Sequence, residues 1–281
     1  MDYVRRGLHN TFNSIKKHKL LFTLIVILQI LFVASSLALG TQYLIKILED
    51  TQGIIGPLEK ANYDSQKIKQ GEPFTPDYAS IYNSYQSMLK KVFSFFAEMA
   101  ALFLLLNGSI WLLSHWMFQE KKQWKIKIKE GVHFLLKIWV STFLLLGTFA
   151  ISSYYILLHF IRISQSFSNI AIVLKSLLIV LFGVYYFFLA ALAIAPPSAW
   201  KKFAARWVQI SIIRFRKTVV LFFIIMVILF VSFTALYGAI EYEISVIFLL
   251  LLGIICMIML CITRLFWIAG VQEIEHETNH N

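Results

Sequence analysis

Six long apolar runs constrain this chain more than any other feature of its sequence. They cover residues 20–39, 92–118, 138–158, 170–195, 219–240 and 244–263. A helix needs about 20 apolar residues to cross a hydrocarbon layer about 30 Å thick, and each run reaches that length. The strands of a membrane barrel would alternate apolar and polar residues over about ten positions, which no run does. We therefore predict an all-α, polytopic membrane protein with six transmembrane helices in a single membrane domain covering residues 1–281.

The overall composition excludes a soluble domain. Of the 281 residues, 59% are hydrophobic and 15% are charged, whereas soluble domains are about 45–50% apolar and about 25% charged. Both cysteines, Cys256 and Cys261, lie within the last apolar run, so they predict no disulfide framework.

Basic residues are concentrated in three segments: before the first run, between the second and third, and between the fourth and fifth. These segments hold 17 Lys and Arg residues against three acidic residues, whereas residues 49–91 hold five basic and six acidic residues. Segments rich in Lys and Arg remain on the cytoplasmic side. We therefore predict a plasma-membrane or inner-membrane protein with both termini cytoplasmic and an extracytoplasmic helical loop at residues 49–91.

Each basic segment is predicted to open a hairpin of two spans. Apolar residues recur every three or four positions from Val4 to Ile15 and again from Trp200 to Ile210, as in an amphipathic helix lying on a membrane surface. Residues 124–129 alternate with a period of two, so the middle segment could be a third such elbow helix or a short strand. The cations expected to meet anionic inner-leaflet lipid are Lys16, Lys17, Lys121, Lys122, Lys202 and Arg206.

The loop at residues 49–91 is predicted to be two protruding helices joined by an irregular stretch. The first span keeps a helical pattern beyond residue 39, and a stripe of apolar residues leads from Tyr78 into the second span. Gly53, Gly56 and Pro57 predict turns between them. The loop is a candidate docking surface for a protein partner, as are the basic elbows.

No catalytic motif is present in the sequence. It contains no helical His pair flanking a Glu, no glycine-rich phosphate loop and no paired cysteines with metal-ligand spacing. The seven histidines are scattered, and His276 with His280 lies in a polar tail where their spacing is weak evidence for a metal. We therefore expect no metal, no cofactor and no enzymatic activity.

Two ionisable residues lie inside the predicted spans. Glu98 and Lys175 are each placed about 8–9 Å below the outer boundary, at 1.5 Å per helical residue. Charges at such depth usually face a partner or a wet cavity. One hypothesis is an intramembrane ion pair that lines a solute path with Asn107; the alternative is that Lys175 extends to the surface while Glu98 is protonated or hydrated.

Two functions are compatible with these patterns. The first is a membrane scaffold or accessory subunit of a larger assembly, motivated by the lack of chemistry. The second is a transporter or channel for a small solute, motivated by the charges in the spans and the repeated hairpins. Nucleic acid is not an expected partner, because the positive charge is spread in patches beside the spans.

Overall fold

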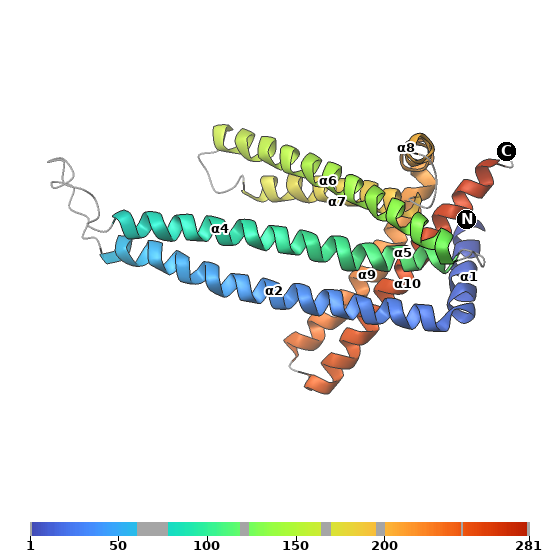
Figure 1. Ribbon diagram of the computed structural model, residues 1–281, viewed down its shortest axis with the longest axis horizontal. Helices are drawn as coiled ribbons and strands as arrows, with labels where there is room; N and C mark the ends of the chain where they lie inside the picture. The colour runs from blue at the N-terminus through green and yellow to red at the C-terminus, as the bar shows by residue number, and fades with distance from the viewer. Residues whose placement is uncertain are drawn as a thin grey trace. The chain divides into compact units, whose positions relative to one another are not determined.

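The computed structural model describes residues 2–60, 78–118, 124–163, 170–194, 200–242 and 244–279, and every regular element in that part of the chain is a helix (Figure 1). The α-helices are α1 (Asp2–Lys17), α2 (Lys19–Lys60), α4 (Tyr78–Leu102), α5 (Gly108–Trp116), α6 (Trp124–Ile163), α7 (Ile170–Ile194), α8 (Trp200–Val208), α9 (Phe215–Glu241) and α10 (Val246–Asn279). Two π-helices, η1 (Phe103–Asn107) and η3 (Gln209–Ile213), interrupt this series.

Within the described ranges, six helical segments are long and apolar enough to cross a membrane. They are α2, the continuous segment α4–η1–α5, α6, α7, α9 and α10. The predicted all-α architecture with six spans is confirmed. The chain has the architecture of a multi-pass helical membrane protein.

The chain forms two compact units. Unit 1 comprises Met1–Ile30 and Gly108–Asn281, and unit 2 comprises Leu31–Asn107. The long helix α2 therefore contributes its first turns to unit 1 and the rest to unit 2.

The core of unit 1 surrounds the last turns of α7. Residues 189–194 of that helix are buried together with Trp111 of α5, Phe203 of α8 and Trp267 of α10. The Trp267 indole donates a hydrogen bond to the Leu189 carbonyl oxygen at 2.7 Å. Nε2 of His115 lies 2.8 Å from the carbonyl oxygen of Leu192. Because the last four carbonyls of a helix lack partners in their own helix, His115 satisfies one of these groups from a neighbouring helix.

The two terminal helices of unit 1 pack closely, with α1 lying across α10 (Figure 1). The buried side of α1 carries Tyr3, Gly7 and Thr11. The Tyr3 hydroxyl donates to the carbonyl oxygen of Lys217 at 3.4 Å, which links α1 to α9 as well. Small residues on the buried side allow the two helix backbones to approach closely. Close packing therefore holds α1 against the bundle, in addition to the polar contacts.

The middle basic segment is not a separate elbow. Residues 124–163 form one uninterrupted α-helix, so the strand alternative is wrong and the alternating residues 124–129 lie in the first turns of α6. A strand would need a partner for its backbone groups, whereas a helix bonds them internally. The other two predicted elbows are observed as separate helices, α1 and α8.

Unit 2 is an antiparallel pair of helices, α2 and α4. Lys91 Nζ lies 2.8 Å from Asp50 Oδ2 and donates to the carbonyl oxygen of Lys46 at 3.1 Å. The predicted turn at Gly53, Gly56 and Pro57 is wrong, because all three residues lie within α2. Gly53 serves packing instead: a Cβ there would be 2.6 Å from the Ser84 hydroxyl oxygen on α4. The two helices predicted on either side of the irregular stretch are observed, ending at Lys60 and beginning at Tyr78, and their protrusion from the membrane stays a prediction.

Candidate functional site

Glu98 is held by a tyrosine of its own unit. The Tyr43 hydroxyl on α2 donates to Glu98 Oε1 on α4 at 2.6 Å. The Tyr43 ring is buried and packs on Phe95, with ring centroids 5.5 Å apart. Tyr43 follows the first apolar run directly, and no local sequence pattern indicates that it contacts Phe95 and Glu98 of the second span.

Lys175 lies in unit 1, exposed on α7, whereas Glu98 lies in unit 2. An ion pair between them would join the two units, and it stays a prediction. Glu98 already has a hydrogen-bond donor, Tyr43, within its own unit. The solute path predicted from the charges of Glu98 and Lys175 therefore stays a prediction.

Asn107, the third residue of the predicted solute path, is buried at the end of the π-helix η1. A π-helix contains an extra residue per turn, which widens the helix locally, and such segments are frequent at functional sites. Sequence reasoning missed both π-helices, because a single inserted residue leaves the apolar composition of a span unchanged.

Three carboxylates at the end of α10 form ion pairs with basic residues of neighbouring helices. We call Glu273, Glu275 and Glu277 the carboxylate cluster. Arg6 of α1 contacts two of them, with Nε 3.2 Å from Glu273 Oε2 and Nη2 2.6 Å from Glu277 Oε1. Lys217 Nζ lies 2.5 Å from Glu277 Oε2.

The third carboxylate of the cluster contacts a different helix. Glu275 lies 2.5 Å from Arg206 Nε of α8. In a helix, residues four apart share a side, whereas a residue two positions on points almost the opposite way. Glu273 and Glu277 therefore meet α1 on one side of α10, and Glu275 meets α8 on the other.

The cluster lies beyond the last apolar run, which ends at residue 263. Here a hydrogen bond from Lys217, helped by the charges of Lys217 and Arg6, holds the pKa of the Glu277 carboxyl below its usual range, although burial acts in the opposite direction. The ionised form of Glu277 is therefore stabilised in the folded protein.

The elbow cations expected to meet lipid are arranged in two ways. Lys16 and Lys17 of α1 and Lys202 of α8 are exposed. Arg206 instead forms its ion pair with Glu275. Lys121 and Lys122 lie outside the described residues. The sequence offered one sign of this pairing, the three acidic residues at 273, 275 and 277. Basic residues that pack on protein near a membrane need acidic partners.

Polar side chains also stabilise the interior of unit 1. Arg264 of α10 donates to the Gln29 amide oxygen at 2.9 Å, and its guanidinium carbon lies 5.2 Å from the centre of the Trp111 ring. Lys137 of α6 is buried with its ammonium 5.5 Å from the centre of the Phe203 ring. These contacts tie α10 to α2 and α5, and α6 to α8, through cation–π and hydrogen-bond interactions.

Among the residues that the structure describes, no group of three or more His, Cys, Asp or Glu side chains is arranged so that it could hold a metal ion. Comparison with known proteins yields no match, whether with protein-family models, curated proteins or solved structures.

Proposed function

We propose that the protein is a membrane scaffold or accessory subunit that binds a protein partner through the part of unit 2 beyond the apolar runs. We call residues 40–60 of α2 and 78–91 of α4 the distal hairpin. At 1.5 Å per residue, the first arm is about 30 Å long and the second about 20 Å. The proposal assigns no catalytic step and no cofactor to the chain.

The observation that carries the proposal is the combination of internal bracing and exposed apolar surface on this hairpin. The Asp50–Lys91 ion pair and a hydrogen bond from Thr51 to the Met88 sulfur at 3.9 Å fix the two arms against each other. Exposed large apolar side chains outside a lipid layer support an interaction site, and tyrosines are enriched in interfaces. The exposed large side chains are Leu44, Ile45, Leu48, Ile55, Tyr78, Tyr82 and Tyr85.

The proposed topology follows the distribution of basic residues. With α1 and α8 on the cytoplasmic side, where anionic lipid is abundant, the distal hairpin extends outside the cytoplasm. The partner is therefore a protein on that side of the membrane that offers a complementary apolar surface. Nucleic acid has no role in this proposal.

A photo-crosslinking amino acid at position 82 tests the proposal in intact cells. We expect one adduct of discrete mass, and its yield should fall severalfold when Tyr85 is changed to Ser on the same face. The same crosslinker at position 230 of α9, whose Phe is exposed within a span, is the control and should give no protein adduct of that mass. A monomer without an adduct at position 82 would contradict the scaffold proposal.

The second candidate function is a transporter or channel for a small solute. The π-helix η1 supports it, because this segment places buried Asn107 within a span whose helix also carries Glu98. In this alternative Glu98, Lys175 and Asn107 lie near the solute path. Uptake or conductance in vesicles reconstituted with the protein tests it, and activity unchanged by Glu98→Gln would remove that residue from the mechanism.

A further inference from the structure

The side of α1 that faces away from α10 carries two parallel rows of side chains. At 100° per residue, Leu8 and Phe12 form an apolar row, and Arg5, His9 and Lys16 form a polar row directly beside it. All five residues are exposed, with Leu8 at 44% and Phe12 at 47%. The opposite side of the helix is the one buried against α10.

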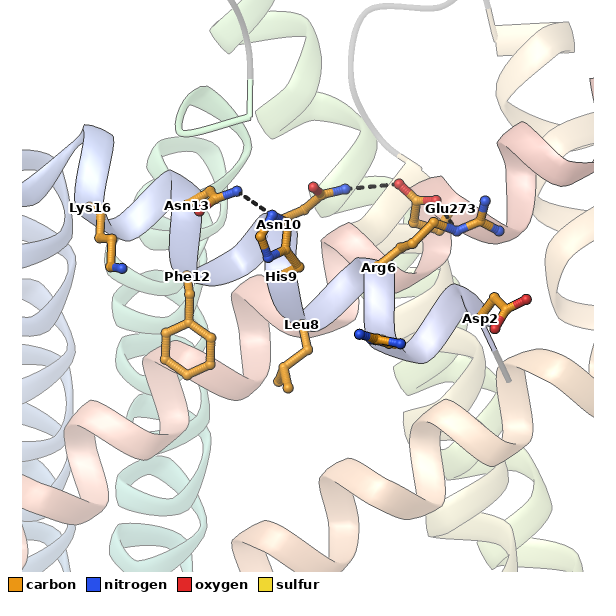
Figure 2. Close-up of a pocket in the computed structure, with 10 residues that line it drawn as sticks. Asp2, Arg6, Leu8, His9, Asn10, Phe12, Asn13, Lys16 and Glu273 are labelled. Atoms are coloured by element: carbon orange, nitrogen blue, oxygen red, sulfur yellow. Dashed lines mark hydrogen bonds and ion pairs between the residues drawn. The ribbon is translucent and has the colours of Figure 1, made fainter.

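A hollow of about 960 Å³ runs along these rows. The hollow is open to its surroundings, so it is a shallow surface depression along α1 and not an enclosed pocket. In Figure 2, Leu8, Phe12 and Lys16 project from the lower side of α1, whereas Asn10 and Asn13 lie on the upper side with Glu273. The hollow therefore combines apolar walls with cationic side chains.

Two acidic residues also line the hollow, and one of them, Glu273, is already paired with other residues of the protein. Glu273 is engaged by Arg6 and accepts a hydrogen bond from the Asn10 amide at 2.8 Å. Asp2 lies in the first turn of α1, where the helix dipole stabilises its negative charge, so it offsets part of the positive charge at that end of the row. Arg5 and Lys16 supply positive charge along the rest of the row.

We propose that this side of α1 binds an anionic glycerophospholipid, with its phosphate beside Arg5 and His9 and an acyl chain along Leu8 and Phe12. Lys16 extends the attraction to the lipid surface at the other end of the row. Charge complementarity selects an anionic over a zwitterionic headgroup. The exposed Leu8 and Phe12 select a lipid over a free phosphate ion, because an ion would leave them in water. The site is separate from the distal hairpin and does not depend on a protein partner there.

The test places a photo-crosslinking amino acid at position 12 of the full chain. The protein is reconstituted in nanodiscs that contain equal amounts of phosphatidylglycerol and phosphatidylcholine, and the crosslinked lipids are identified by mass spectrometry. An attraction of about 1 kcal/mol per basic residue corresponds to about a fivefold preference for each. We expect phosphatidylglycerol to be enriched about tenfold or more among the adducts, and less so at high salt.

The Arg5→Gln/Lys16→Gln variant should reduce the enrichment to about twofold or less. The matched control is Lys201→Gln/Lys202→Gln, which removes the same charge from exposed positions of α8 and should keep the enrichment. A crosslinker at position 230 of α9 should report the bulk lipid ratio. Size-exclusion chromatography confirms that each variant is folded.

Several outcomes would overturn the proposal. They are adducts at the bulk lipid ratio at position 12, protein adducts in place of lipid, and enrichment that survives Arg5→Gln/Lys16→Gln. Equal loss in the α8 control would also do so, because it would show a general effect of net charge. A large decrease in lipid adducts on adding inorganic phosphate would identify free phosphate as the ligand instead.

Discussion

Gly7 of α1 lies against Gly270 of α10, so closely that a Cβ atom at Gly7 would be 3.1 Å from the Gly270 Cα. The neighbouring atoms are backbone, which cannot move aside as a flexible side chain does. A Cβ at Gly270 would in turn be 2.5 Å from the Leu221 side chain of α9. The attachment of α1 to the bundle therefore depends on two positions that carry no side chain.

Gly7→Leu should detach α1 from α10. The added side chain has no room, and overpacking of this kind costs about 1–3 kcal/mol. The measurement is the thermal midpoint of the detergent-solubilised protein, together with protease cleavage near residue 18. The control is Gly147→Leu in α6, where a Cβ would meet nothing within 4 Å. Equal stability of the two variants would show that the close approach of α1 and α10 is unimportant.

The carboxylate cluster predicts a loss of stability in acid. Because the pKa of Glu277 is lowered in the folded protein, its contribution is fully present above the pKa of an unfolded Glu. That contribution disappears as pH falls through the lower, folded pKa. Thermal midpoints measured from pH 7 down to pH 3 should therefore fall, and less steeply for Glu277→Gln than for the parent chain. An identical slope for the two proteins would contradict this assignment.

The Asp50–Lys91 ion pair should stabilise the distal hairpin modestly. Both side chains are partly exposed, at 13% and 28%, so the expected loss for Lys91→Met is up to about 1 kcal/mol. The exchanged pair Asp50→Lys/Lys91→Asp should recover most of it, as judged by hydrogen exchange of the hairpin amides. Lys90→Met removes the same charge one residue away and serves as the control. No recovery in the exchanged pair would indicate that Lys91 acts through its hydrogen bond to the Lys46 carbonyl oxygen.

Charge reversal tests the predicted pairing of Glu98 with Lys175. If the two form an ion pair, Glu98→Lys and Lys175→Glu should each reduce the yield of folded protein, and the double exchange should restore it. Tyr43→Phe removes the hydrogen bond to Glu98, and we expect it to cost about 1–2 kcal/mol. A double exchange no better than either single variant would dismiss the ion pair.

The spans could be predicted from the sequence because membrane insertion depends on properties that are local in the chain. Twenty apolar residues in succession form a helix in lipid regardless of their neighbours, and the periodicity from Trp200 to Ile210 likewise predicts α8. The turn predicted at Gly53 is wrong because the role of this glycine depends on a residue far away in the chain. A glycine in a turn and a glycine at a close helix contact have the same local appearance, and only the position of Ser84 on α4 distinguishes them.

The ion pairs of the carboxylate cluster could not be predicted, because they join parts of the chain that are distant in sequence. Arg6 and Glu277 are separated by 271 positions in sequence, so no local pattern connects them. Arg264 was missed because it directly follows the last apolar run, where an arginine usually marks a membrane boundary. Its contacts with Gln29 and Trp111 place it inside the bundle instead.

The ion pairs between α1 and the end of α10 can form only late in the synthesis of the chain. Of the described helices, α1 leaves the ribosome first, and α10, which holds its carboxylate partners, leaves last. Until then Arg6 lacks its carboxylate partners, and the buried side of α1 lacks the surface of α10. A chain that stalls before α10 therefore retains a loose, basic leading helix, which cellular quality-control proteases could recognise as unfinished.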